Sequence, residues 1–191
     1  GPGDDEVAAR VQTTPSVAMD ASGNFVVTWT DENAKDGSSY GVYAQRYNAS
    51  GVAQGAEFRV NTTTANQQYL SNVAYDGLGN FIVTWTSFGQ DAASTNGVYA
   101  QRYNASGVAQ GGEFRVNTTT ANGQWGPSIV ADASGNFLIV WTDDALDGSG
   151  AGVYGQRYNA SGVAQGGEFR ITTTTTGDQS VPYVGTLGTG Y

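Results

Sequence analysis

The sequence predicts an all-β fold made of three successive four-stranded repeats. Residues 41–51 of the 191-residue chain recur unchanged at 97–107 and, with glycine replacing one alanine, at 152–162. Trp29, Trp85 and Trp141 are each 56 residues apart, which sets the period of the repeat. No segment combines a 3.6-residue apolar period with capping residues, so no helix is expected.

Each repeat contains four runs that are typical of β-strands, separated by polar turns. In the first repeat these runs cover residues 16–19, 25–30, 42–47 and 56–60. The second run is rich in β-branched and aromatic residues, which favour strands. The turns at 20–24 and 48–51 contain Asp, Asn and Gly, the residues that tight turns prefer. Consecutive runs joined by short turns predict an antiparallel sheet in each repeat.

The repeats divide the chain into six expected segments. Residues 1–3 look like a protease-cleavage scar, and residues 4–15 resemble the remnant of a preceding repeat. The three full repeats cover 16–71, 72–127 and 128–181, and residues 182–191 begin a fourth copy.

Two architectures fit three repeats of four strands. Four antiparallel strands in about 40 to 60 residues are typical of a β-propeller blade. A β-trefoil, which also has three repeats of four strands, is the alternative. The partial fourth copy favours the propeller, because a closed threefold unit does not need it.

The repeat also resembles known propeller families. Residues 17–28, with the Asp-x-x-Gly-Asn turn between two apolar strands, are similar to the inner hairpin of NHL-type blades. Residues 45–51 are similar to the outer hairpin of the same blades. The whole repeat resembles arrays in long secreted bacterial proteins, often ones with RTX calcium modules. The resemblance implies an extracellular or cell-surface location.

The composition excludes several function classes. The chain has no cysteine and no histidine, and Lys35 is its one lysine. This excludes Ser-His-Asp and Cys-His catalysis and His- or Cys-ligated metals. The net charge of −9 argues against nucleic acid and anionic membrane surfaces as partners.

These observations predict that the chain is not an enzyme. Glycoside hydrolysis needs a specific pair of carboxyl groups, and three near-identical repeats offer no unique pair. The first hypothesis is a non-catalytic structural or adhesive repeat module of a secreted bacterial protein. A lectin-like carbohydrate binder with several equivalent sites is the alternative, and a glycoside hydrolase is the least favoured hypothesis.

Candidate binding residues lie in the segments that differ most between the copies. The linking loops carry the aromatic residues Tyr69 and Trp125, which could bind a ligand or act as a packing lid. The loops between the second and third strands carry acidic residues, which are either solvated or ligands for weakly bound calcium. Those considered for ligand binding are Asp36, Asp91 and Asp147, and those considered for calcium are Asp31, Asp36, Asp143, Asp144 and Asp147. No cofactor is expected, and calcium is the one alternative considered. The absence of both EF-hand and RTX spacing favours solvated loops over a specific calcium site.

The other recurring residues have structural interpretations. The three strand tryptophans are expected in the core, and Asp20 and its counterparts are expected to bond their own turns. Arg46 is expected to pair with Glu57 across neighbouring strands, as are their counterparts. Three blades leave broad apolar faces open, so the expected partner is a second copy of the chain. The two chains would form a homodimer of six blades.

Overall fold

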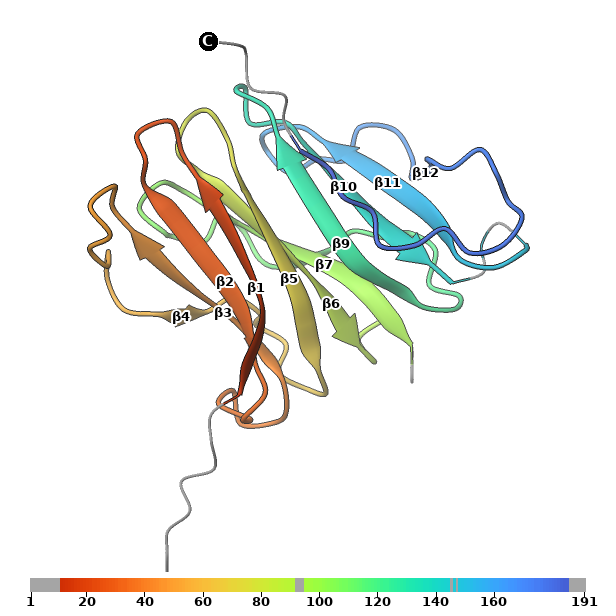
Figure 1. Cartoon of the computed structure of the whole chain (residues 1–191), viewed down its shortest axis with the longest axis horizontal. Coiled ribbons are helices and arrows are strands. Elements are labelled where there is room, and N and C mark those ends of the chain that lie inside the picture. The colour runs from red at the N-terminus through yellow and green to blue at the C-terminus, as the bar shows by residue number, and fades with distance from the viewer. Residues whose placement is uncertain (1–10, 92–94, 145, 147, 186–191) are drawn as a thin grey trace, which may run out of the picture.

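The computed structural model describes residues 11–91, 95–144, 146 and 148–185. These residues form twelve strands in three four-stranded antiparallel sheets and contain no helix. Each sheet takes its strands from one continuous stretch of chain and is called a blade below (Figure 1). Since the described residues include no helix, none of them could form a membrane-spanning helix.

The three blades repeat the same strand order. Blade 1 contains β1 (Gln12–Met19), β2 (Phe25–Asp31), β3 (Gly41–Tyr47) and β4 (Phe58–Arg59). Blade 2 contains β5 (Gln68–Tyr75), β6 (Phe81–Phe88), β7 (Asn96–Tyr103) and β8 (Phe114–Arg115). Blade 3 contains β9 (Gln124–Ala131), β10 (Phe137–Asp143), β11 (Gly152–Tyr158) and β12 (Phe169–Arg170). The prediction of four strands per repeat is confirmed.

The strand boundaries differ from the expected ones at both edges of a blade. β1 begins at Gln12 rather than at residue 16, because residues 12–13 pair with β2 before a bulge shifts the register at Ser16. Residues 12–15 therefore form part of blade 1. β4 has two residues, because only Phe58 and Arg59 pair with β3.

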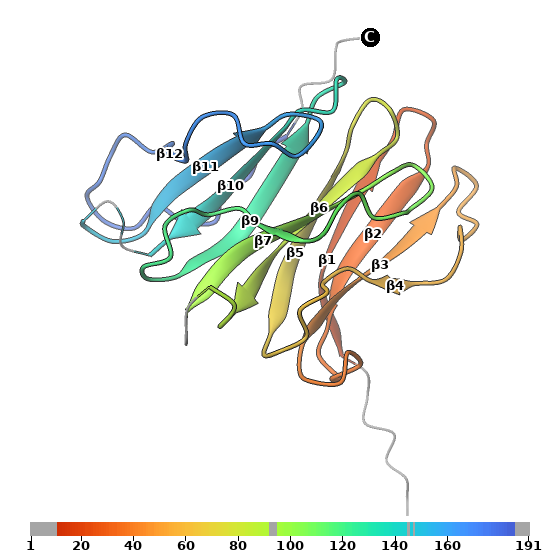
Figure 2. The same cartoon turned by 180° about the vertical axis from the view of Figure 1, so that it is seen from behind.

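The inner strands β1, β5 and β9 lie side by side, and the sheets pack face to face (Figures 1 and 2). This is the arrangement of consecutive propeller blades, in which the first strand of each blade faces a common axis. The prediction of a propeller is confirmed, and the β-trefoil alternative is wrong.

The apolar core consists of two layers, one between each pair of neighbouring blades. Val26 and Val42 of blade 1 pack with Val73 and Trp85 of blade 2, and Ile82 and Val98 of blade 2 pack in turn with blade 3. Trp85 and Trp141 are buried, as predicted, whereas Trp29 is only half-buried. Trp29 is less buried because it faces the outer side of blade 1, where the described residues form no further blade.

The two ends of the blades have different characters. At one end, the turn end, Asp20 Oδ1 accepts hydrogen bonds from the backbone N–H groups of Ser22 (2.8 Å) and Asn24 (2.9 Å). Asp76 and Asp132 make the same bonds in their turns, so the turn prediction is confirmed. The other end, the loop end, carries the β2–β3 loop and its counterparts together with the starts of the inner strands.

The predicted Arg–Glu pairs across neighbouring strands are wrong. Arg46 donates from Nη2 to the carbonyl oxygen of Ala105 in blade 2 (3.0 Å) and from Nη1 to that of Ser106. Glu113 of blade 2 accepts hydrogen bonds from Thr62 and Thr63 in the linker that leaves blade 1. These charged side chains therefore join consecutive blades, because the stacking of the sheets places them at the edges of an interface rather than opposite each other.

Candidate functional site at the loop end

The loop end brings Trp125 and Asp144 together in blade 3. The residue after Gln124 in β9 is Trp125, whose Nε1 donates a hydrogen bond to Asp144 Oδ1 over 2.6 Å. Asp144 follows β10 directly and is exposed, while Trp125 is half-buried. The indole N–H therefore fixes the orientation of an exposed carboxylate.

Gly123 leaves the space that this carboxylate occupies. A Cβ atom at position 123 would lie 2.4 Å from Asp144 Oδ2, closer than any real contact. The corresponding position in blade 2 is Gln67, so the carboxylate could not adopt the same position there. Blade 3 thus differs from blade 2 at three neighbouring positions, with Gly123, Trp125 and Asp144 replacing Gln67, Tyr69 and Phe88.

Tyr69 of blade 2 completes this group of residues. Its hydroxyl group donates to Asn96 Oδ1 over 3.0 Å. Burial raises the pKa of Tyr69, the bond to Asn96 opposes that rise, and the nearby charge of Asp144 adds to it. Tyr69 and Trp125 occupy equivalent positions near the starts of neighbouring inner strands, β5 and β9. Of these two predicted residues, Trp125 makes the hydrogen bond to Asp144.

Asp36 and Asp91 lie apart from this group and bond within their own blades. Asp91 accepts a hydrogen bond from the hydroxyl group of Tyr99 and one from Asn117 Nδ2 (2.6 Å). Asp36 accepts from the backbone of Ser38 over 3.0 Å, and its Oδ2 is buried without a hydrogen-bond partner. Both carboxylates lie over a glycine at the start of the third strand, where they close the loop. Asp147, the third residue predicted here, lies outside the described residues.

The residues predicted to bind calcium do not converge in the described part of the chain. Asp31 and Asp143 are buried, and Asp143 accepts hydrogen bonds from Gln124 Nε2 and the backbone of Leu146, each over 2.9 Å. Among the described residues, no group of three acidic side chains lies close enough to hold an ion. Calcium binding therefore stays a prediction without a defined site.

The surface near the axis is neutral. A groove of about 270 Å³ runs along the inner strands, and none of the twelve described residues that line it is acidic. Its polar side chains include Ser16, Asn72 and Ser128. The described residues of this groove therefore supply no carboxylate.

Glu32 occupies in blade 1 the position that Asp144 occupies in blade 3. Its Oε1 accepts a hydrogen bond from Thr13 Oγ1 over 2.8 Å, and Thr13 corresponds to Trp125. The same contact between an inner-strand residue and the acid after the second strand thus occurs in two blades. Sequence analysis missed Glu32 as a candidate, although its place directly after the second strand was a usable signal.

Glu113 is the half-buried acid with the most hydrogen bonds, but its environment is structural. Burial alone would raise the pKa of Glu113, and the bonds from Thr63, Thr62 and Gln90 outweigh it and lower the pKa. Glu168 has a lowered pKa for the same reason, through Thr118 and Thr119. Because the arrangement repeats between blades 2 and 3, it serves the interface rather than a single reaction site.

The comparisons with known proteins concern the fold. No protein-family model matches the chain, and no curated protein is similar to it in sequence at a significant level. Several solved structures that resemble it are glycoside hydrolases. An endo-arabinase from Bacteroides thetaiotaomicron VPI-5482 superposes with a TM-score of 0.52 at 15% identity, over 83% of this chain and 61% of the enzyme.

Two further enzymes superpose equally well. An α-L-arabinofuranosidase from Lactobacillus brevis has a TM-score of 0.52 at 10% identity, over 84% of this chain and 53% of the enzyme. A thermostable family-43 glycoside hydrolase has a TM-score of 0.52 at 9% identity, over 84% of this chain and 54% of the enzyme. The chain therefore spans between half and two thirds of the length of each enzyme, and at these identities the likeness establishes the fold alone. Its class is that of an all-β protein built of propeller blades.

These neighbours overturn two predictions from the sequence. The chain was expected to be a non-catalytic structural or adhesive module, with a lectin as the alternative, and not to be an enzyme. Its fold is instead one that glycoside hydrolases use. The prediction failed because it treated the three repeats as equivalent, whereas the loop-end residues differ between blades and form a group that occurs once.

Proposed function

We propose that this protein hydrolyses glycosidic bonds in an arabinose-containing polysaccharide, with the substrate bound at the loop end beside Trp125 and Tyr69. The observation that carries the proposal is the Trp125–Asp144 pair, an oriented and exposed carboxylate beside aromatic rings. Aromatic faces are suited to stacking against sugar rings, and the N–H of Trp125 leaves the ring available for this contact. The arabinan-degrading enzymes that share the fold supply the substrate class.

The reaction needs two carboxyl groups on opposite sides of the bond that breaks. Asp144 is the first, since its Oδ2 accepts no hydrogen bond from a described residue and is available to a water molecule or a sugar hydroxyl. Glu32 is the acid at the equivalent position, but it belongs to blade 1, whose inner strand is separated from that of blade 3 by β5, so it is not assigned as the partner of Asp144. Phe88 stands at that position in blade 2, so the two acids are not repeated in every blade.

Hydrolysis of arabinan and of 4-nitrophenyl α-L-arabinofuranoside by the purified chain tests this function. Asp144→Asn should lower kcat by about a hundredfold or more, as expected for loss of an acid or base. Asp132→Asn is the control, because that exposed carboxylate lies in a turn at the opposite end. A chain that releases no sugar from either substrate, or whose rate survives Asp144→Asn, would contradict the proposal.

A further inference from the structure

We propose that the outward face of blade 3 binds blade 1 of a second copy of this chain, with Arg157 entering the turn at residues 48–51 of that copy. The structure contains two interfaces between blades, one between blades 1 and 2 and one between blades 2 and 3. Both are built from the same contacts between the same positions. The two open faces carry the two halves of a third such interface.

The first repeated contact is an arginine that enters the turn between the third and fourth strands of the next blade. Arg102 of blade 2 donates from Nη1 to the carbonyl oxygen of Ser161 (2.6 Å) and from Nη2 to that of Ala160 (2.8 Å). Arg46 does the same to blade 2. Arg157 is the counterpart in blade 3; it is exposed, and its guanidinium group donates no hydrogen bond to a described residue.

The receiving turn in blade 1 is empty. A Cβ atom added at Gly107 would lie 2.6 Å from the guanidinium of Arg46, and one at Gly162 would lie 3.0 Å from that of Arg102. The same addition at Gly51 meets nothing within 4 Å. Blade 1 therefore has the turn without an arginine, and blade 3 has the arginine without a turn.

The second repeated contact is an aromatic pair. Phe58 of blade 1 packs against Tyr103 of blade 2 with 5.4 Å between ring centroids, and Phe114 packs against Tyr158 at 5.5 Å. Phe169 is the counterpart in blade 3 and is 40% exposed. The corresponding tyrosine for it is Tyr47, which stacks on Phe25 in blade 1 just as Tyr103 stacks on Phe81.

The third repeated contact is a glutamate. Glu113 and Glu168 accept hydrogen bonds from the linker of the preceding blade. Glu57 of blade 1 has no preceding blade and contacts Lys35 instead. In the dimer, Glu57 of the second copy would accept hydrogen bonds from Thr173 and Thr174 of the first copy. These two threonines are the counterparts of Thr118 and Thr119.

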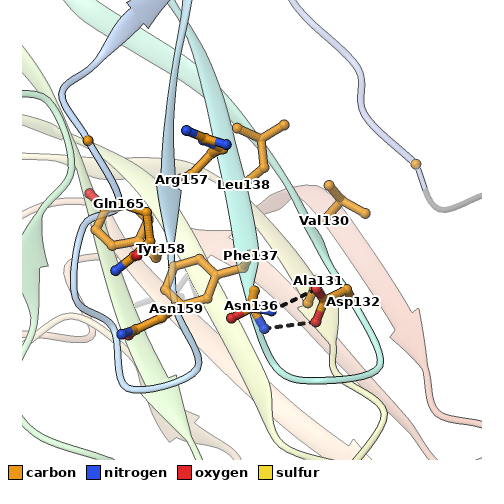
Figure 3. A pocket seen from close by; sticks show the side chains of 12 residues that line it. Val130, Ala131, Asp132, Asn136, Phe137, Leu138, Arg157, Tyr158, Asn159 and Gln165 are labelled. Atoms are coloured by element: carbon orange, nitrogen blue, oxygen red, sulfur yellow. Dashed lines mark hydrogen bonds between the residues drawn. The ribbon is translucent and has the colours of Figure 1, made fainter.

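The apolar surfaces of the two open faces match as well. Val17 of blade 1 is 62% exposed, whereas its counterparts Val73 and Ile129 are 5% and 4% exposed. On blade 3, a hollow of about 730 Å³ lies over Val130, Leu138 and Arg157 (Figure 3). Val26 and Ile82, which correspond to Leu138, are both buried under a neighbouring blade.

Residues 181–184 occupy the place that β1 of the second copy would take. Val184 donates its backbone N–H to Ser128 Oγ over 3.2 Å, as Ile129 of β9 donates to Asn72 Oδ1 over 3.2 Å. These residues correspond to 14–17 of blade 1 and hold the inner-strand position loosely, since Tyr183 is 87% exposed. β1 of the second copy therefore displaces them, and the segment competes with the association.

Closure follows from the geometry of propellers. Known propellers have about four to eight blades, so two three-bladed chains close a ring and three chains exceed that range. The assembly is then a twofold-symmetric dimer with two identical interfaces, twice the 19.9 kDa of one chain.

Sedimentation equilibrium on the full chain tests the proposal, with the unmodified chain and three variants compared over the same range of concentrations. The unmodified chain should form a dimer of about 40 kDa, twice its 19.9 kDa mass. Arg157→Glu should raise the dimer dissociation constant about tenfold per interface and therefore about a hundredfold in total, since charge-assisted bonds are lost at both. Arg115→Glu, which changes an exposed arginine of the middle blade by the same charge, should leave the constant unchanged.

Val184→Asp provides an independent readout. It weakens the docking of residues 181–184, and Val184 itself forms no part of the proposed interface once β1 of the second copy has displaced it, so the substitution should tighten the dimer. A 20 kDa monomer at every concentration, for both the unmodified chain and Val184→Asp, would overturn the proposal. A dimer that is insensitive to Arg157→Glu would also overturn it, because the contact would then use another surface.

Discussion

At the scale of single residues, the inner strands contain an unusual backbone conformation that repeats four times. Thr14, Leu70, Gly126 and Val181 have φ angles of 47°, 53°, 62° and 56°. The first three lie within the register shift of their inner strands, Val181 is at the corresponding position after blade 3, and three of the four are not glycine. A left-handed conformation costs a residue with a Cβ roughly 1–2 kcal/mol, so the bulge is maintained against local preference.

Leu70 therefore offers a test, because we expect glycine to be less destabilising than alanine at this position, which is the reverse of the usual order. Leu70→Ala removes side-chain packing and keeps the backbone strain. Leu70→Gly removes the same packing and relieves the strain, although glycine adds about 0.5–1 kcal/mol of unfolded-state entropy. We expect the glycine variant to be the more stable of the two by about 0.5–1 kcal/mol. Urea unfolding of both variants measures the difference, and an alanine variant that is more stable would mean that φ at this position is negative.

The turns and buried tryptophans were predictable at this scale, but the contact between Trp125 and Asp144 was not. Asp20 and its counterparts are recognisable because the partner N–H groups lie two and four residues away in the chain. The partner of Asp144 is 19 residues away, across two strands. Local sequence spacing does not show such a contact, so Asp144 was grouped with its neighbours as a calcium ligand.

At the scale of elements, the linker-to-glutamate contact is the main polar connection between blades. Thr62 donates its N–H to Glu113 Oε2 over 2.6 Å, and Gln90 Nε2 donates to Oε1 over 2.8 Å. Glu113→Gln should lower the free energy of unfolding by about 1–2 kcal/mol, a value reduced for the partial exposure of the carboxylate. Glu57→Gln is the matched control, since its exposed carboxylate contacts only Lys35 among described residues and should change stability by less than about 0.5 kcal/mol.

The same contact sets a dependence on pH, which is part of this prediction. The pKa values of Glu113 and Glu168 lie below the ordinary value of 4.5 in the folded chain. A lowered folded-state pKa means that the stabilisation is complete above pH 4.5 and is lost as the pH falls below it. Glu113→Gln should make the free energy of unfolding, measured by urea titration at low protein concentration, less dependent on pH below 4.5. An unchanged dependence on pH would show that other carboxylates, such as Asp20 and Asp132, control acid unfolding.

The elements themselves were largely predictable, and the contacts between them were not. Strand positions follow from local composition. Only the strand boundaries differ from the predicted ones, at the start of β1 (Gln12) and in the two-residue strand β4. The pairing of Arg46 with Glu57 failed because sequence proximity suggested a contact within one sheet. The actual partners of Arg46 are 59 and 60 residues away, one blade further along. Because neighbouring repeats are nearly identical in sequence, a contact between residues about one period apart leaves no recognisable pattern in the sequence.

At the scale of the whole molecule, the middle blade is the one covered on both faces. All residues of β6 except the last are buried, whereas β2, with almost the same sequence, is half-buried at alternate positions. In repeat architectures, stability is close to a sum of the intrinsic stability of each unit and the interfaces with its neighbours. Blade 2 has two interfaces, and blades 1 and 3 have one each.

Backbone hydrogen exchange should therefore be slowest in β6 when the chain is dilute. β2 and β10 have similar sequences and hence similar intrinsic exchange rates, so a difference in protection reports the missing interface. As the protein concentration rises and blade 3 of one chain covers blade 1 of another, the protection of β2 and β10 should approach that of β6. Mass spectrometry of exchange in peptides covering the three strands gives this comparison directly. Equal protection in all three strands at the lowest concentration would show that the open faces do not weaken their blades, and no second copy would then be needed to stabilise them.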